Sequence, residues 1–262
     1  MNMDRFGVHD VLDFTFYDKV TGEPVLTLDT LKMSNMEATA ESVYATGGSG
    51  NNRLLGWDFG REVLFNLQDA LLNPQTVALQ TGVDLKKDKA LIKTRESVIA
   101  EVVDPTNPEG EVTHVKIPLS HVPLAKGMFA YKTANGVTQG EKIDLKDAVV
   151  ADQAITVPAE NLDGGDRVIV HYQFETVNES ETIVIDSNKF PAFYEGVGDM
   201  VWRNETTGID ERVQIQIPKL KVSSSFSLQM QPDGDPAVFD LDIDVFKEAG
   251  ETEMVKIIRY DE

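Results

Sequence analysis

The sequence predicts an all-β protein with one short helix. Apolar and polar residues alternate with a period of two along much of its 262 residues, and this is the pattern of strands that bury one face. Clusters of Gly, Pro, Asn and Asp separate these runs and predict turns. One segment combines a helix start signal with a helix stop signal. We therefore expect a β-sandwich flanked by a short helix.

The N-terminal part of the chain begins with a predicted hairpin. Residues 11–17 and 24–28 have strand patterns, and residues 18–22 supply the turn between them. The β pattern continues over residues 37–44. After a glycine-rich segment, residues 62–68 alternate again, with Val, Phe and Leu on one face. These runs predict the first strands of the sandwich.

The predicted helix follows these strands. Asn73 suits the N-cap, Pro74 suits the first helical position, and Gly82 suits the stop after the last turn. A helix of this length has little stability of its own. We therefore expect Val77 and Leu79 to hold it against the sandwich.

The middle of the chain differs in character from the two ends. Residues 86–162 contain short β-like pieces separated by turn clusters, and they predict a β-rich insertion of open role. Residues 1–85 and 163–262 then form the main sandwich. Longer strands are predicted again in the C-terminal part, at residues 167–175, 182–186, 199–203, 212–217, 223–230 and 237–246. The last two are expected to form a hairpin through the Pro/Asp/Gly turn at residues 231–236.

The charge balance limits the possible partners. The chain has 44 Asp and Glu against 24 Lys and Arg, a formal net charge of −20. Unaided binding to DNA, RNA or an anionic membrane is therefore not expected, although a polyanion could slide past without adhering. The absence of cysteine excludes disulfides and thiolate metal sites. The sequence has neither a leader pattern nor an apolar run of membrane-spanning length, which predicts assembly in the cytoplasm.

No catalytic motif stands out in the sequence. The four histidines, at positions 9, 114, 121 and 171, form no ligand-spaced pair. Neither a nucleophile elbow nor a kinase signature is present. A dispersed carboxylate pair stays open, because such residues meet only in the fold. We expect a protein that is not an enzyme and that has no cofactor and no metal.

The glycine-rich segment is the first candidate functional site. It reads Thr46, Gly47, Gly48, Ser49, Gly50, Asn51, Asn52 and Arg53. A phosphate-binding P-loop would end in Gly-Lys-Ser/Thr and lead into a helix, and this segment lacks that ending. Two interpretations stay open: an exposed turn with no partner, and a mobile connection that a neighbouring subunit orders.

An acidic strand is the second candidate site. Asp240, Asp242 and Asp244 alternate with apolar residues, so in a strand they share one face. Three carboxylates in a row repel one another unless water, cations or basic neighbours lie close. A solvated outer face, a calcium site and an acidic wall of a channel are the alternatives. The spacing does not match an EF-hand loop, which makes calcium the weaker one.

Three stretches of the chain carry a family resemblance. The first is RLLGWDFGREVLFNLQDALLNPQTVALQTG, residues 53–82. The second comprises residues 189–199 and 214–221, and the third is residues 223–240. Together they resemble the major tail tube proteins of tailed bacteriophages. The three stretches occur in the N-terminal and C-terminal thirds and flank the predicted insertion, which has no matched counterpart.

The resemblance implies a structural protein of the virion tail. Subunits would join side by side in rings, expected to be hexameric, and the rings would stack into a tube through which DNA leaves the capsid without specific binding. Sheets of neighbouring subunits would close a β-barrel around the lumen and so remove exposed sheet edges. Other tail proteins would bind at the tube ends, with no membrane partner.

The resemblance also gives both candidate sites a role. The loop of residues 47–53 would be ordered by the next subunit, and Asp240, Asp242 and Asp244 would face the lumen. An immunoglobulin-like binding or decoration module is the alternative function. It would stay monomeric or form a small closed oligomer, whereas a tube protein forms rings.

Overall fold

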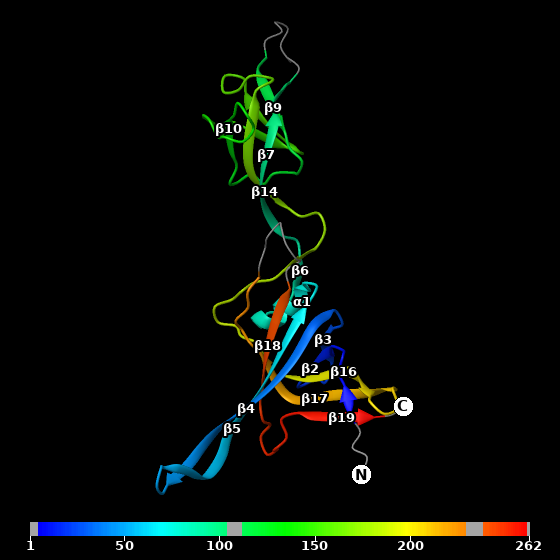
Figure 1. Cartoon of the computed structure of the whole chain (residues 1–262). Helices are drawn as coiled ribbons and strands as arrows, with labels where there is room; N and C mark the ends of the chain where they lie inside the picture. The colour runs from blue at the N-terminus through cyan, green and yellow to red at the C-terminus, as the bar shows by residue number, and fades with distance from the viewer. Residues whose placement is uncertain (1–4, 104–111, 229–237, 261–262) are drawn as a thin grey trace. The chain divides into compact units, whose positions relative to one another are not determined.

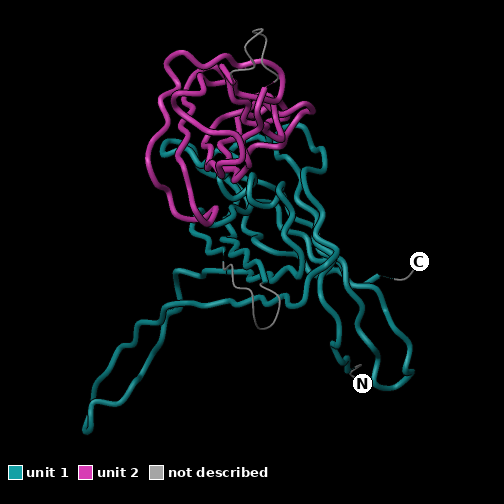
Figure 2. Tube along the Cα trace, turned by 90° about the horizontal axis from the view of Figure 1, so that it is seen from above, with its two compact units in different colours: residues 1–85, 183–262 teal, residues 86–182 magenta. Residues whose placement is uncertain are grey.

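The structure is a computed structural model that describes residues 5–103, 112–228 and 238–260. The chain divides into two compact units (Figure 2). Unit 1 comprises residues 1–85 and 183–262, and unit 2 comprises residues 86–182. Unit 2 extends past the expected end at residue 162, because strand β14 (Arg167–Glu175) pairs along the whole of strand β7 (Leu91–Ile99).

Unit 1 is built on one large antiparallel sheet (Figure 1). Its strands are β1 (Phe6–Gly7), β2 (Asp13–Asp18), β3 (Pro24–Leu28), β4 (Leu31–Gly47), β5 (Asn52–Asp69), β16 (Tyr194–Asn204), β17 (Asp210–Val222), β18 (Phe239–Val245) and β19 (Lys256–Tyr260). The main order is β3-β2-β16-β17-β18-β5-β4, with β1 beside β16 and β19 beside β17. The all-β class predicted from the sequence is confirmed for the described residues.

The sheet divides at β17. Residues 212–216 of this strand pair with β19, and residues 220–222 pair with β18. Because β16 occupies one edge of β17, strands β19 and β18 lie one after the other along its opposite edge. Strand β17 therefore leads from the β2–β16 part of the sheet into the β18–β5–β4 part.

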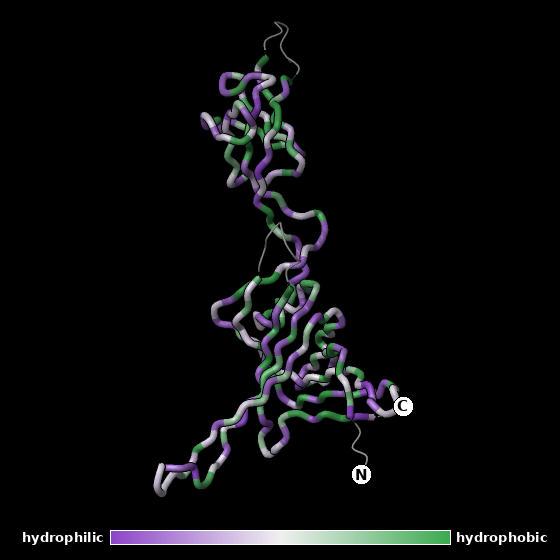
Figure 3. The backbone as a smooth tube through the Cα atoms, viewed as in Figure 1, coloured by the Kyte–Doolittle hydropathy of each residue, from purple (hydrophilic) through white to green (hydrophobic). Residues whose placement is uncertain are grey.

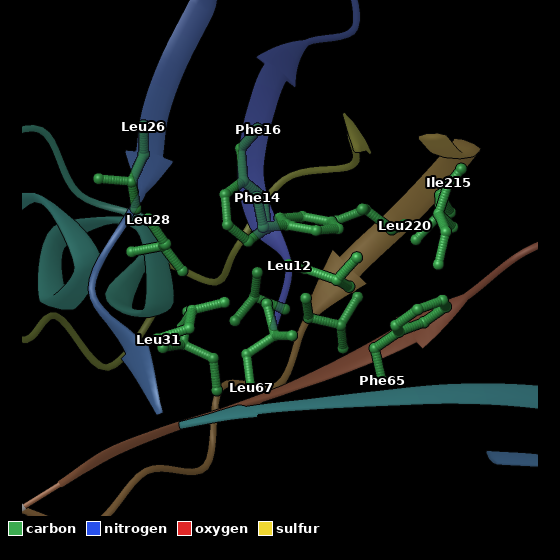
Figure 4. Packing of buried hydrophobic residues seen from close by; sticks show 14 of the residues in the cluster. Leu12, Phe14, Phe16, Leu26, Leu28, Leu31, Phe65, Leu67, Ile215 and Leu220 are labelled. Atoms are coloured by element: carbon green, nitrogen blue, oxygen red, sulfur yellow. The ribbon is translucent and has the colours of Figure 1, made fainter. Parts of the chain in front are cut away.

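A single core joins these two parts of the sheet (Figure 4). Phe14 and Phe16 of β2 pack in one cluster with Phe65 of β5. Leu28 of β3 and Leu31 of β4 belong to the same cluster, although their strands lie at opposite ends of the sheet order. The sheet therefore curls around one core, and removal of these side chains from water is the main stabilising term.

Helix α1 (Pro74–Thr81) forms where the sequence predicts it. The Asn73 side chain accepts a hydrogen bond of 2.9 Å from the backbone N–H of Gln75, and Gly82 ends the helix with φ +68°. Leu79 belongs to the buried core and Val77 packs against it while partly exposed. Within the described ranges, no helix is long and apolar enough to cross a membrane.

Unit 2 has its own sheets and its own core. Its strands are β6 (Lys86–Asp88), β7, β8 (Glu101–Val102), β9 (His114–Pro118), β10 (Phe129–Lys132), β11 (Lys142–Ile143), β12 (Val149–Ala151), β13 (Ala154–Pro158), β14 and β15 (Ser180–Thr182). They form the sheets β11-β10-β14-β7 and β12-β13-β9-β8 and the pair β15-β6. Residues of both four-stranded sheets, such as Ile117 and Val170, share one buried cluster.

Several predicted strands are wrong in extent or existence. Residues 183–186 are not a strand, because β15 ends at Thr182. Residues 223–228 are not a strand either, and β18 pairs with β5 instead of with them. The rest of that predicted hairpin, including its turn, lies outside the described residues. The strand expected over residues 62–68 begins much earlier, at Asn52.

Candidate functional site

The longest hairpin of unit 1 projects beyond the sheet as a two-stranded ribbon (Figures 1 and 2). Strand β4 pairs with β5 from Asp69 to Asn52, whereas β18 pairs with β5 only over residues 63–69. Residues 39–62 therefore have no third strand beside them in the described part of the chain. We call this segment the arm. All of its residues except Ala45 and Gly47 are exposed.

One face of the arm is apolar. Val43 lies opposite Trp57, and Ala45 lies opposite Leu55. Directly opposed residues share a face of a ribbon, and Phe59 shares it because it is two residues from Trp57. We call these five residues the apolar face. Trp57 is 55% exposed and Leu55 is 62% exposed, and Figure 3 shows hydrophobic stretches along the ribbon. Contiguous exposed apolar side chains mark interaction surfaces.

On the other face of the arm, side chains of β4 contact side chains of β5. The Ser42 hydroxyl donates a hydrogen bond of 2.6 Å to Asp58. The Arg53 guanidinium lies 4.0 Å from the centroid of the Tyr44 ring, a cation–π geometry. Gly56 lies opposite Tyr44, and a Cβ there would come within 3.0 Å of that ring. These contacts link β4 and β5 on this face, whereas the side chains of the apolar face have no comparable partners among the described residues.

The tip of the arm is the glycine-rich segment. Residues 46–47 and 52–53 pair as strand residues, so only residues 48–51 form the turn. The N–H of Asn51 donates a 3.1 Å hydrogen bond to the carbonyl of Gly48, and both residues have positive φ. A strand follows this turn, whereas a P-loop leads into a helix. The phosphate-cradle interpretation therefore has no support here.

The acidic strand lies elsewhere in unit 1, on β18. Asp240, Asp242 and Asp244 are exposed and alternate with buried residues such as Leu241 and Ile243. The buried residues belong to the core of unit 1. The three carboxylates thus share the outer face of the sheet, and we call them the acidic face.

Neighbouring strands relieve part of the repulsion within the acidic face. Asn66 of β5 donates a hydrogen bond of 2.7 Å from Nδ2 to Asp242. Lys221 of β17 is the cross-strand partner of Asp244. Opposite charges at paired positions are favourable in a sheet. A recess of about 420 Å³ opens beside this strand and is lined by Asn35, Glu37, Leu64, Phe65, Asn66, Ser223, Asp242, Ile243 and Asp244.

The metal and histidine candidates gain no support from the described residues. Within the described ranges, no three His, Cys, Asp or Glu side chains are grouped so that they could hold a metal ion. His114 contacts the hydroxyl of Thr113 at 3.1 Å, whereas His121 stacks on Phe174 with 3.9 Å between the ring centroids. The two histidines that lie closest in sequence thus have different partners.

The apolar face of the arm was not predicted as a site. Its signal is present in the sequence, since Leu55, Trp57 and Phe59 alternate with Gly56 and Asp58. Alternation of this kind normally indicates one face buried in the same chain. Here the apolar face lies outside the core of unit 1.

The fold and the exposed surfaces together define an all-β protein with a projecting hairpin arm that has an exposed apolar face. A sequence model of the YomU/Tube protein family matches residues 6–259. The chain belongs to this family.

One curated relative bears the name that also appears in the name of the family. The chain is 24% identical over 179 residues to the SPbeta prophage-derived uncharacterized protein YomU of Bacillus subtilis (strain 168). The alignment covers 68% of this chain and 59% of the relative. The chain thus spans less than two thirds of the relative's length.

Proposed function

We propose that the chain is a phage-derived structural subunit that self-assembles into rings, and that the rings stack into a tail tube. The tube would conduct the phage genome into the host. The tube family and the prophage relative support a phage structural protein. The exposed apolar face of the arm is the observation that carries the assembly step.

The arm is built to be completed by another molecule. An isolated two-stranded hairpin is marginally stable in water, and this one exposes Trp57, Leu55 and Phe59 on one face. Burial of apolar surface stabilises a complex by about 25 cal/mol per Å² and therefore favours association. A second copy that covers this face removes the surface from water and would also contact the tip at residues 47–53, whose turn is already formed in the single chain.

The sheet also presents two edges for side-by-side joining. Strands β3 and β4 lie at opposite ends of the main sheet order, and no described strand pairs with their outer edges. An unpaired edge is a template for another strand. Pairing of the β4 edge of one copy with the β3 edge of the next is a head-to-tail contact, which closes into a ring when the rotation allows it. A β-barrel around a lumen would follow.

The acidic face suits the wall of that lumen. Asp240, Asp242 and Asp244 point away from the core, and a ring repeats them in every subunit. A negative wall repels DNA phosphates and releases no counterions, so DNA passes without adhering. Other tail proteins would bind the tube ends, and assembly would occur in the host cytoplasm before the tube joins the virion.

Electron microscopy of the purified chain tests this function. We expect negative-stain images at high concentration to show rings and tubes, and light scattering to rise with concentration. Hydrogen exchange at residues 46–53 should slow on assembly, because an interface protects backbone amides that the free chain exposes. A monomer at every concentration and salt tested would contradict the proposal and favour an immunoglobulin-like binding module.

A further inference from the structure

Unit 2 contains a complete core of its own. Val115, Ile117, Ile155 and Val170 are fully buried within one cluster formed by residues of unit 2. Tyr172 is only 1% exposed in the same cluster. A compact unit with its own closed core is the usual definition of a domain that folds independently.

The chain enters and leaves unit 2 through two paired strands. Lys86 of β6 is the register partner of Thr182 of β15, and Lys87 is the partner of Glu181. The ammonium of Lys87 lies 3.2 Å from the Glu181 carboxylate, although an exposed pair of this kind contributes little stability. Facing residues of an antiparallel ladder lie about 5 Å apart. The two ends of unit 2 are therefore held one strand spacing apart.

Unit 1 closes on itself just before and just after these strands. Gly82 lies so close to Phe190 that an added Cβ would come within 2.2 Å of the Phe190 carbonyl oxygen. This contact joins the end of helix α1 to the segment that leads into β16. Unit 1 thus holds the two chain segments that flank unit 2 in direct contact with each other.

The edge strands of the two units differ in length and in charge. In the described part of unit 2, three of the four edge strands of the two four-stranded sheets, β8, β11 and β12, have only two or three residues each. The fourth edge strand, β7, carries the exposed charges Lys93 and Arg95. Short and charged edges are the devices by which proteins avoid strand addition. By contrast, the edge strand β4 of unit 1 has 17 residues.

We propose that unit 2 is an independently folding module and that the contacts between copies are made by unit 1 alone. The statement about contacts between copies rests on the proposed tube function. The statement that unit 2 folds independently does not depend on that function. The surface of unit 2 would then stay free of contacts with other copies in a ring.

A matched pair of substitutions tests whether unit 1 alone makes the contacts between copies. Val149 of β12 is 59% exposed and Val43 of the arm is 53% exposed, and both lie in edge strands. We expect V149D to leave the concentration needed for ring formation within about twofold of the unmodified chain. We expect V43D to raise it by about tenfold or more, equivalent to about 1.4 kcal/mol. Loss of rings in V149D with normal rings in V43D would overturn the proposal.

A deletion and a calorimetric scan test whether unit 2 folds independently. Residues 87–181 are replaced by Asn-Gly, which joins Lys86 to Thr182 through a two-residue hairpin turn. We expect a cooperative unfolding transition for this shortened chain, rings as in the full chain, and two separable transitions in the full chain. One inseparable transition in the full chain, or a folded shortened chain without rings, would overturn the proposal. Absence of rings in the unmodified chain would instead overturn the proposed function, and calorimetry would still decide whether unit 2 folds independently.

Discussion

The Tyr172 hydroxyl donates a hydrogen bond of 2.5 Å to the Glu96 carboxylate inside unit 2. The same carboxylate accepts hydrogen bonds from the N–H and the hydroxyl of Ser120, at 3.0 and 3.2 Å. The N–H of His121 in turn donates to the Tyr172 oxygen. These bonds fasten the loop after β9 to strands β7 and β14. Glu96 therefore links three segments of unit 2.

Removal of this link should destabilise unit 2. We expect Tyr172→Phe to lower the free energy of unfolding of unit 2 by about 1–2 kcal/mol, because Glu96 loses a donor and the His121 N–H loses its acceptor. Differential scanning calorimetry measures the change. Phe129→Leu, which alters an exposed ring on β10, serves as the control and should leave the transition within about 0.5 kcal/mol.

The stability of unit 2 should also fall at alkaline pH. Burial raises the pKa of Tyr172 well above its usual value, and the hydrogen bond to Glu96 and the negative charge of Glu96 raise it further. In the unfolded chain a tyrosine ionises near pH 10. The contribution is therefore complete below about pH 10 and is lost as pH rises above that value, because only the unfolded state releases the proton.

Thermal unfolding of unit 2 between pH 9 and 11 checks this dependence. We expect Tyr172→Phe to flatten the decline above about pH 10. An equally steep decline in the variant would mean that other groups cause it.

Gly82 should be intolerant of substitution. Its φ of +68° is a left-handed conformation, which costs a residue with a Cβ about 1 kcal/mol or more. A Cβ would also collide with the Phe190 carbonyl. We expect Gly82→Ala to destabilise unit 1 by about 2–4 kcal/mol, measured by chemical denaturation. Gly22→Ala is the control, since Gly22 has a similar φ of +72° but no neighbouring atom within 4 Å of an added Cβ.

The helix could be predicted from the sequence because its signals are local. Asn73, Pro74 and Gly82 act on backbone groups within one turn of themselves, so no knowledge of the fold is needed. The alternation of Asp240, Asp242 and Asp244 was likewise readable, because β18 has one face in the core and one face exposed.

The first half of β5 was not predicted, although Leu55, Trp57 and Phe59 alternate with Gly56 and Asp58. Such alternation normally indicates a strand with one face buried in the same chain, whereas residues 52–62 are exposed on both faces. The opposite error occurred at residues 223–228, where a strand was predicted and none forms. Their sequence has a strand-like composition, but the chain leaves the sheet after Val222, and β18 takes β5 as its neighbour. Pairing between distant strands decides such cases.

The apolar face of the arm should be needed for assembly and not for folding. We expect Trp57→Ala to prevent or strongly weaken ring formation, because truncation of a tryptophan that is an interface hot spot costs about 2 kcal/mol or more. Circular dichroism and thermal unfolding should stay unchanged, since Trp57 is exposed in the single chain. Val20→Ala is the control, because Val20 is 93% exposed and lies in the turn after β2. Normal rings from Trp57→Ala would show that the arm does not join the copies.

The acidic face should influence the passage of DNA through the tube. We expect replacement of Asp240, Asp242 and Asp244 by asparagine to leave tubes intact but to slow genome ejection. Each substitution removes one charge from every subunit of a ring, and the summed potential is strongest inside a narrow bore. Salt screens such a potential over about 8 Å at physiological strength, so the effect should be larger at low salt.

Replacement of the same three residues by lysine should slow ejection further, because a positive wall binds phosphates and releases counterions. The buried partners Leu241 and Ile243 are untouched in both variants, so unfolding measurements should confirm that unit 1 is intact. Glu23→Lys is a charge control, since Glu23 is exposed in the turn before β3. Ejection can be followed by DNA release from particles built with each variant. Normal ejection with the lysine variant, or an assembled tube with these side chains on its outer surface, would contradict a lumen-facing acidic strand.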